Sequence, residues 1–437
     1  MARKPKEIIA KTNEKLEKLK NIDPFLIDLS LRENPVGARV GMTLEDKVKI
    51  FPLLRDFGFK HILLGTLDYG MPDELEVDDD FMMYLRDQKI DMTGCYAFTQ
   101  IGLADETGLF TPDPSMTKLR DYKVPNTIHE IYVSDDGIGT QYGTVDPVGT
   151  LERSLPRSIA WLHKHIKGDH GKEPRIIINL VDGCDGFACF LERTCDILKI
   201  LAKQPIEGVS FEDDRGTYLP FQVGAYAEIA RSILGPSKRL MVHMHAGGGF
   251  ENAAVLEALI HGADGVWAGL PKRAAIIGHA SLGELMANLL RVGNRHLKSH
   301  HYKFDQLLSL ATTLQVIDEE ERVPDDLPIL GNNAYRLPLT FFQQKAGRFM
   351  DLAPEAIGGK YRYRICPVVS DTGVIAGRLG EVTGCRPEEF SKNVLEQMIR
   401  LMRRDLRAGK RIVYDEPENL LALYARATVT SERDASL

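Results

Sequence analysis

The chain has 437 residues, a formal net charge of −7, and 43% hydrophobic and 27% charged residues, as in an ordinary globular protein. Its negative charge gives a nucleic-acid partner no overall electrostatic support, and the lack of a run of about 18 apolar residues argues against a transmembrane helix. The six cysteines form neither a C-x-x-C pair nor a small disulfide framework, and residues 1–20 lack the apolar run of a signal peptide. We therefore expect a cytoplasmic protein in reducing surroundings.

After a charged helix expected over residues 4–21, short apolar runs alternate with helical patterns. The eight apolar runs are Phe25–Leu31, His61–Leu67, Asp91–Phe98, His129–Ser134, Arg175–Val181, Gly208–Glu212, Arg239–His245 and Gly265–Leu270. Helix candidates between them are Leu44–Phe57, Thr150–Ile166, Phe190–Gln204, Gln222–Leu234 and Glu251–His261. Eight β-then-α units over about 270 residues predict an α/β chain folded as a (β/α)8 TIM barrel. A doubly wound open sheet is the alternative fold.

Two segments of the barrel region predict long loops. Thr107–Asn126 contains three prolines, and Asp135–Gly149 contains four glycines. Long loops in a compact domain often serve as lids or binding loops. Beyond the last apolar run the pattern becomes polar and then helical, with helices expected over Glu389–Ala408 and Pro417–Arg426. The expected organisation is a lead-in helix at 1–22, a catalytic barrel at 23–295 and a mostly helical C-terminal subdomain at 296–437.

The segment from Met241 to Gly249 combines a strand pattern with two histidines and a glycine run. Alternate strand residues share a face, so His243 and His245 point the same way. Two imidazoles at a strand end can hold a divalent metal ion, and the glycines after Ala246 remove side chains that would crowd it. Taken alone, an H-x-H pair is more often structural, so its role depends on the other strand ends.

Polar residues also follow three other predicted strands, where a barrel enzyme has its active site. The first strand ends in Arg32 and Glu33, which taken alone would read as a simple ion pair. The sixth ends in the charged run from Glu212 to Arg215, and His279 follows the eighth. In a barrel, all of these groups meet the histidine pair at one end.

Together, the motifs resemble the metal-dependent carbon–carbon ligases and lyases that include isopropylmalate synthase, homocitrate synthase and hydroxymethylglutaryl-CoA lyase. Their first strand carries D-x-T-L-R-D, which Asp28–Glu33 resembles, and their seventh carries H-x-H, as at His243 and His245. Segments that resemble further family motifs in the same order are Glu212–Gly216, Gly278–Ser281 and Pro328–Tyr335. The resemblance covers nearly the whole chain and implies the same barrel.

The resemblance implies a role for each matching residue. Arg32 would bind and polarise a 2-oxo acid or the developing enolate oxygen. The implied metal ligands are Glu33, His243, His245 and His279. A third imidazole favours Mn, Fe, Co or Zn over Mg, which prefers oxygen ligands. His279 stands where the family has an asparagine, and an ordinary loop residue is the alternative interpretation.

The remaining substrate contacts and the general base are less sharply defined. Candidate substrate-binding residues besides Arg32 are Asp214, Arg215, Lys272 and Arg273; the three cations suit a carboxylate or a CoA phosphate but equally suit solvent. Candidates for the base are Asp182, Glu212, Asp213, Asp214, Tyr69, Tyr132 and Tyr142. Of these, Asp182 and Asp213 are taken, together with Arg32, as the expected catalytic residues.

Three positions depart from the family pattern. Leu63 stands where the second strand carries a glutamate, and Val181 replaces the glutamate of the fifth strand. The segment from Arg336 to Phe341 replaces H-E-S-G-I-H, so the histidine that the family uses for proton transfer is absent. The metal site is therefore expected to persist while the proton-transfer residues are partly lost.

The expected activity is a divalent-metal-dependent Claisen-type condensation, in which acetyl-CoA or a related acyl donor and a 2-oxo acid give a 2-hydroxy acid. A lyase or aldolase that cleaves a hydroxy acyl substrate is the second possibility; the missing histidine favours it, and the segment Pro328–Tyr335 favours the synthase. The motifs are also compatible with an inactive metal-binding barrel that serves as a scaffold and with a different metal reaction, such as an oxidation. The resemblance further implies a homodimer.

Overall fold

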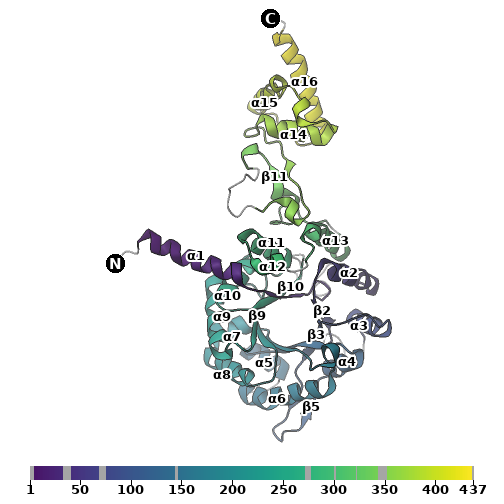
Figure 1. The fold of residues 1–437 in the computed structure, drawn as a ribbon, viewed down its shortest axis with the longest axis vertical. Helices are drawn as coiled ribbons and strands as arrows, with labels where there is room; N and C mark the ends of the chain where they lie inside the picture. Colours follow the sequence, from purple (N-terminus) through teal and green to yellow (C-terminus); the bar gives the residue numbers. More distant parts are fainter. Residues whose placement is uncertain are drawn as a thin grey trace. The chain divides into compact units, whose positions relative to one another are not determined.

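The structure is a computed structural model that describes residues 4–32, 41–67, 75–142, 146–270, 277–299, 302–320, 322–342 and 352–435. Its main feature is a closed barrel of parallel strands in the order β1-β2-β3-β6-β7-β8-β9-β10, with β10 pairing with β1 (Figure 1). The barrel strands are β1 (Phe25–Asp28), β2 (His61–Thr66), β3 (Cys95–Gln100), β6 (Asn126–Ile131), β7 (Ile176–Leu180), β8 (Gly208–Asp213), β9 (Arg239–Met244) and β10 (Gly265–Ala268).

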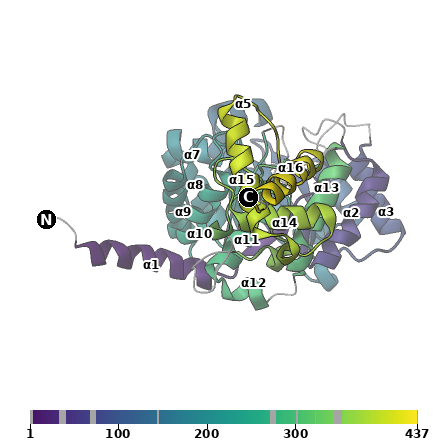
Figure 2. The same cartoon turned by 90° about the horizontal axis from the view of Figure 1, so that it is seen from above.

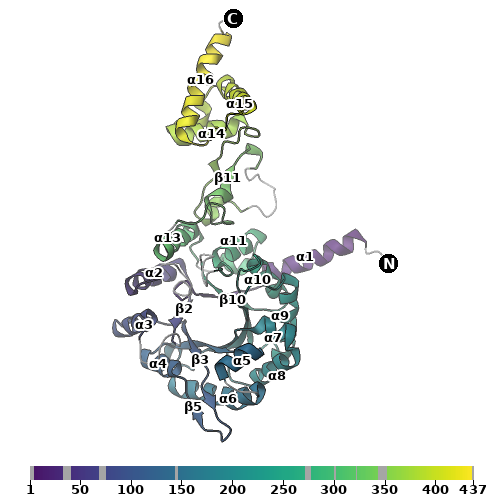
Figure 3. The same ribbon diagram turned by 180° about the vertical axis from the view of Figure 1, so that it is seen from behind.

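Helices connect successive strands and cover the outside of the barrel, as views from the two sides show (Figures 1 and 3). They are α2 (Leu44–Phe57), α3 (Val77–Asp87), α4 (Pro114–Tyr122), α5 (Asp135–Tyr142), α6 (Pro147–His165), α7 (Gly183–Cys189), α8 (Leu191–Ala202), α9 (Pro220–Leu234), α10 (Glu251–Ile260) and α11 (Leu282–Val292). Along one flank, α8, α9 and α10 pack in succession, which the view from above also shows (Figure 2). The lead-in helix α1 (Pro5–Asn21) packs against α10 and α11.

All eight predicted strands are present, so the predicted (β/α)8 barrel is confirmed and the open sheet is wrong. The apolar runs lack alternation because helices bury the outer face of each strand while the barrel buries the inner face. The inner face is filled by an apolar cluster of Ile27, Leu29, Leu63, Tyr96, Phe98, Ile128, Ile177, Met241 and Trp267. Within it, Phe98 and Trp267 meet edge to face with ring centroids 5.3 Å apart.

Two segments predicted as loops contain helices instead. Helix α4 begins at Pro114, where the missing N–H does no harm because first-turn N–H groups have no partner within a helix. Asp113 caps this helix by accepting a hydrogen bond from the Ser115 backbone N–H at 2.8 Å. Helix α5 and the first turn of α6 lie within the second segment, Asp135–Gly149. Pro114, one of the three prolines that suggested a loop, therefore marks a helix start.

The chain divides into two compact units, Met1–Val323 and Pro324–Leu437. The sequence placed this boundary at 295/296; the division comes later because α13 (Leu307–Glu319) packs against α2 of the barrel. The second unit contains β11 (Arg336–Leu337), β12 (Arg362–Tyr363), α14 (Thr372–Thr383), α15 (Lys392–Arg407) and α16 (Pro417–Ala435). Apolar side chains of its helices form a core of their own.

Two further features concern the cysteines and the hydropathy of the helices. All six cysteines are free thiols, in keeping with the expectation that they form no disulfide framework. Among the described residues, no helix combines the length and the hydropathy that crossing a membrane requires.

Candidate active site

A layer of polar side chains lies inside the barrel, at the carboxyl ends of the strands. Because strand side chains alternate, residues two positions beyond the apolar cluster continue its inward face. The layer includes Gln100 on β3, Glu130 on β6, Asn179 on β7, Glu212 on β8 and His243 on β9. Strand register pairs Gln100 with Glu130, Glu130 with Asn179, and Glu212 with His243. The barrel therefore brings these polar groups together above its apolar core.

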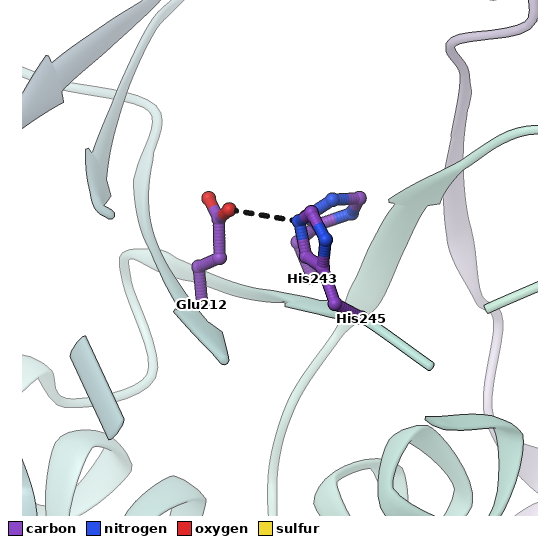
Figure 4. A group of neighbouring side chains, drawn as sticks. All are labelled: Glu212, His243 and His245. Atoms are coloured by element: carbon purple, nitrogen blue, oxygen red, sulfur yellow. Dashed lines mark hydrogen bonds and ion pairs between the residues drawn. The ribbon is translucent and has the colours of Figure 1, made fainter. Parts of the chain in front are cut away.

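Glu212, His243 and His245 form a compact group whose ligand atoms all lie within 4.8 Å of one another (Figure 4). His245 Nε2 lies 3.1 Å from Glu212 Oε1, and the Asn179 side-chain amide donates to Glu212 Oε2 at 2.9 Å. The two imidazole rings meet edge to face with centroids 4.8 Å apart. Within the described ranges, no other cluster of His, Cys, Asp and Glu has this spacing.

His243 is fully buried and is held in one tautomer. Its Nδ1 is 2.8 Å from the Trp267 carbonyl oxygen; because a carbonyl only accepts, Nδ1 carries the proton and Nε2 keeps its lone pair. Nε2 is buried and has no hydrogen-bond partner among the described residues. Burial, and then the neighbouring imidazoles of His245 and His279, hold the pKa of His243 well below its usual value. The ring is therefore neutral, as a metal ligand must be.

His279 lies beside this group, since its segment forms an antiparallel bridge with His245. Its Nδ1 donates to the Ala280 carbonyl at 2.9 Å, and its buried Nε2 has no partner within the described part of the chain. Burial lowers the pKa of His279 to about 3. Its ring centroid is 5.2 Å from that of His243 and 6.4 Å from that of His245. His279 thus offers a third imidazole at the edge of the group.

The donor atoms fit a divalent transition metal. Two or three neutral imidazoles with one carboxylate suit Mn, Fe, Co or Zn. Histidines that bind metals usually donate their second N–H to a carbonyl or carboxylate, as His243 and His279 do here. The carboxylate in this group is Glu212, whereas the carboxylate expected from the sequence, Glu33, lies outside the described residues.

Arg32 reaches the same interior from the end of β1 and is buried. Its Nε donates to Thr66 Oγ1 at 2.9 Å, and its guanidinium carbon lies 4.3 Å from the centroid of the Phe98 ring. Its Nη2 is 3.9 Å from Glu130 Oε1, while Glu130 Oε2 accepts from Gln100 Nε2 at 2.9 Å. These contacts hold the guanidinium in one orientation inside the barrel.

A buried ion pair supports the segment that carries Arg32. Lys47 on α2 is fully buried; its Nζ lies 2.5 Å from Asp78 Oδ1 and also donates to the Leu31 carbonyl. Asp78 Oδ2 accepts from the Thr66 backbone N–H at 2.7 Å. The pair therefore ties together the ends of β1 and β2, which position Arg32 and its hydrogen-bond partner.

The two acids expected to be catalytic, Asp182 and Asp213, both accept hydrogen bonds from the backbone. Asp213 follows the inward residue of β8 and therefore lies on the opposite face, where its Oδ2 accepts from the Tyr218 backbone N–H at 2.9 Å. Asp182 accepts backbone hydrogen bonds from Val133 at 2.7 Å and Ser134 at 2.8 Å, one on each carboxylate oxygen. These hydrogen bonds give both carboxylates a structural role, and their catalytic role stays a prediction.

Asp214 and Arg215 follow β8 and are bound to neighbouring charges. Arg215 is exposed, with Nη2 2.6 Å from both carboxylate oxygens of Asp185 and Nη1 3.7 Å from Asp214 Oδ1. Partial burial raises the pKa of Asp214 to about 6, opposed by Arg215. Substrate binding by these two residues stays a prediction. Predicted residues that lie outside the described ranges are Glu33, Tyr69, Lys272 and Arg273.

Reasoning from the sequence missed two inward polar residues, Glu130 and Asn179. Each interrupts an apolar strand, and a lone polar residue in a strand buried on both faces signals a site, because burying it without a partner is costly. Leu63, which stands where the family has a glutamate, belongs to the apolar core. Among the described residues, carboxylates therefore enter the interior from β6 and β8.

No family model matches the chain. A curated relative, (R)-citramalate synthase from Sulfolobus acidocaldarius, is 21% identical over 368 residues. The match covers 80% of this chain and 64% of the relative, so the chain spans less than two thirds of that protein's length.

Solved structures of two lyases share the fold. HMG-CoA lyase from Acinetobacter baumannii, in complex with coenzyme A and 3-methylmalate, matches with a TM-score of 0.54 at 14% identity, covering 71% of this chain and 94% of that one. HMG-CoA lyase from Brucella melitensis matches with a TM-score of 0.51 at 14% identity, covering 68% and 99%. The resemblance in the motifs is thereby confirmed: the chain is similar in sequence to (R)-citramalate synthase and shares the barrel fold of the HMG-CoA lyases.

Proposed function

We propose that this chain catalyses a divalent-metal-dependent Claisen-type condensation, in which acetyl-CoA or a related acyl donor and a 2-oxo acid give a 2-hydroxy acid, while water cleaves the thioester and the CoA thiol is released. The observation that carries the proposal is the meeting of a Glu212, His243 and His245 donor set with a buried Arg32 inside one barrel. The similarity to (R)-citramalate synthase supports this class of reaction.

Glu212, His243 and His245 would hold the ion, with His279 as a further donor. When bound, the ion would polarise the carbonyl of the 2-oxo acid and neutralise negative charge that develops on its oxygen. The chain prepares for this by holding His243 in the tautomer with a free Nε2 and by fixing Glu212 with the Asn179 amide. Such support keeps the donor atoms oriented before the ion arrives.

Arg32 would bind the carboxylate or the developing oxyanion of the 2-oxo acid. Its hydrogen bond to Thr66 and its stacking on Phe98 restrict the guanidinium in advance, so substrate binding does not have to order a free side chain. Glu130 lies beside the guanidinium, with its Oε1 3.9 Å from Nη2. We therefore assign Glu130 a positioning role.

A lyase or aldolase that cleaves a hydroxy acyl substrate is the second candidate for the same residues. The segment from Arg336 to Phe341 lacks the histidines of the corresponding synthase motif, which favours it. Cleavage reverses the bond-forming step and regenerates from the hydroxyl group the carbonyl that the ion would polarise, so the donor set and Arg32 would serve either direction.

Thiol release from acetyl-CoA, measured with a panel of 2-oxo acids and with Mn, Zn, Co and Mg in turn, tests the proposal. We expect one or more 2-oxo acids to stimulate release, and we expect His243→Ala to abolish the stimulation. His296→Ala is the matched control, because that imidazole is 43% exposed and lies outside the barrel interior. Failure of every 2-oxo acid would contradict the synthase; metal-dependent cleavage of a hydroxy acyl-CoA in its place would establish the lyase.

A further inference from the structure

The second compact unit contains a cavity of about 230 Å³ lined mainly by basic side chains. The cavity is well above the roughly 15 Å³ that admits one water molecule, so it has room for a small polar ligand. Its lining consists of Arg336, Lys360, Arg362, Tyr363, Arg378 and Glu381. We call this the basic pocket.

Two of its arginines stand directly opposite each other. Strands β11 and β12 are parallel, and their register pairs Arg336 with Arg362. Opposite residues on neighbouring strands place their side chains on the same face, and like charges in that position destabilise the pair. Among the described residues, Arg362 and Lys360 have no ion-pair or hydrogen-bond partner for their side chains. This short sheet therefore carries a repulsion that an anion would relieve.

Two carboxylates neutralise only part of the charge. Glu381 Oε2 accepts from Arg378 Nη1 at 2.9 Å, and Asp415 Oδ2 accepts from Arg336 Nη1 at 3.3 Å. The other oxygen of each acid accepts a backbone N–H, from Tyr363 at 3.2 Å and from Ile365 at 2.9 Å. Four cations against two carboxylates leave an excess of two positive charges, so the acids orient the arginines without balancing them.

One wall of the basic pocket is fixed by close packing. A Cβ atom on Gly377 of α14 would lie 2.3 Å from the ring of Tyr363, so the ring can approach the helix only because this position is glycine. Tyr363 follows Arg362 on β12, and the contact therefore holds the strand against α14. The guanidinium groups are thus presented from a packed surface.

We propose that the basic pocket binds a phosphate group. A phosphomonoester carries a charge of about −1.5 to −2 at neutral pH, which matches the excess charge. Arginine forks suit its tetrahedral oxygens because they form paired hydrogen bonds, and Lys360 adds a point charge at the rim. The phosphate comes either from inorganic phosphate or from a phosphomonoester on an adenosine-containing ligand, and the inference does not depend on the chemistry of the barrel.

Calorimetric titration of the full chain tests this inference, with inorganic phosphate and with adenosine 3′,5′-bisphosphate at constant ionic strength. We expect saturable binding of one phosphate group per chain. Tighter binding of the bisphosphate assigns the site to a phosphomonoester, whereas equal affinities assign it to free phosphate.

Variants distinguish binding in the basic pocket from nonspecific attraction of phosphate to positive charge. We expect Arg336→Ala and Arg362→Ala each to weaken binding by about 10-fold or more, since each removes a charge-assisted hydrogen bond. Glu381→Gln removes a competing negative charge and should tighten binding. Arg386→Ala is the matched control, because this arginine is 82% exposed, pairs with Glu389 and lies outside the pocket.

The exposed positions keep the test independent of folding. If Arg336→Ala unfolds the unit, the effects of Lys360→Ala and Arg362→Ala on phosphate binding test the proposal. Both side chains are exposed and contribute nothing to the apolar core, so these variants should stay folded. Absence of saturable binding, or binding that Arg362→Ala leaves unchanged, would overturn the proposal.

Discussion

The Nζ atom of Lys47 lies 2.5 Å from Oδ1 of Asp78, and both side chains are buried beneath the segment that carries Arg32. Lys47→Met leaves the Asp78 carboxylate buried without its counter-charge, a change that typically costs roughly 3–5 kcal/mol. We expect the free energy of unfolding, measured with urea, to fall by about that amount.

Lys49→Met is the control for this variant. Lys49 lies on the same helix, is exposed and pairs with Glu45 at 3.0 Å, so its replacement should change stability by less than about 0.5 kcal/mol. Equal effects of the two substitutions would mean that the buried pair does not stabilise the barrel.

The contact between Arg32 and Glu130 predicts an effect on substrate binding. Glu130→Gln removes the charge that holds the guanidinium, and we expect the affinity for a 2-oxo acid to fall by roughly 10-fold. Titration of the metal-loaded protein measures this. Glu207→Gln is the control, because Glu207 precedes β8 at the opposite end of the barrel, where it pairs with Arg239 at 2.6 Å. Similar losses in the two variants would rule out a specific role for Glu130.

Asp28 predicts a particular dependence of stability on pH. Burial raises its pKa to about 7, whereas in the unfolded chain the pKa is about 3.9. Between about pH 4 and pH 7 the folded protein therefore keeps a proton that the unfolded chain has released, and stability falls as the pH rises. Asp28→Asn removes this dependence. The free energy of unfolding of the variant, minus that of the unchanged protein, should therefore rise by up to about 4 kcal/mol from pH 4 to pH 7.

Comparing Asp28→Asn with the unchanged protein separates the effect of Asp28 from that of other titrating groups. His243 and His279 have lowered pKa values, so their contributions to stability increase with pH over part of the same window. Both proteins share these histidines, and the histidine contribution cancels in the difference. Urea unfolding at pH 4 and pH 7 gives the two values; a difference that does not change with pH would be incompatible with a protonated, buried Asp28.

The position of His279 predicts a graded effect on metal affinity. It lies at the edge of the donor group, so His279→Asn should weaken metal binding by less than about 10-fold, whereas loss of a direct ligand in His243→Ala should cost more than about 100-fold. Titration with Mn and with Zn compares the two. Complete loss of the ion in His279→Asn would show instead that the third imidazole is essential.

The sequence predicts the barrel well because each strand is buried on both faces and so appears as an apolar run. Strand alternation likewise places His243 and His245 on one face without any tertiary information. The position of Glu212 beside these histidines cannot be predicted in this way. It depends on the register between β8 and β9, which no local pattern encodes. The same alternation places Asp213, one position later, on the opposite face of the strand, and its catalytic role stays a prediction.

The helices at Pro114 and Asp135 show a second limit of reasoning from the sequence. Proline and glycine mark loops and helix ends alike, and only the cap from Asp113 to Ser115 and the packing behind it decide between the two. Glu130 could not be identified as a site residue from its own strand, because that strand is predicted from its apolar residues. Its role depends on the contact with Arg32, which lies nearly a hundred residues earlier in the chain.

Metal titration of the purified chain tests the central claim most directly. We predict that the chain binds one divalent ion, and that Glu212→Gln, His243→Ala and His245→Ala each lose it while the control His296→Ala retains it. Absence of any bound ion, or an affinity that these three substitutions leave unchanged, would contradict the assignment of this group as the metal site and, with it, the proposed function.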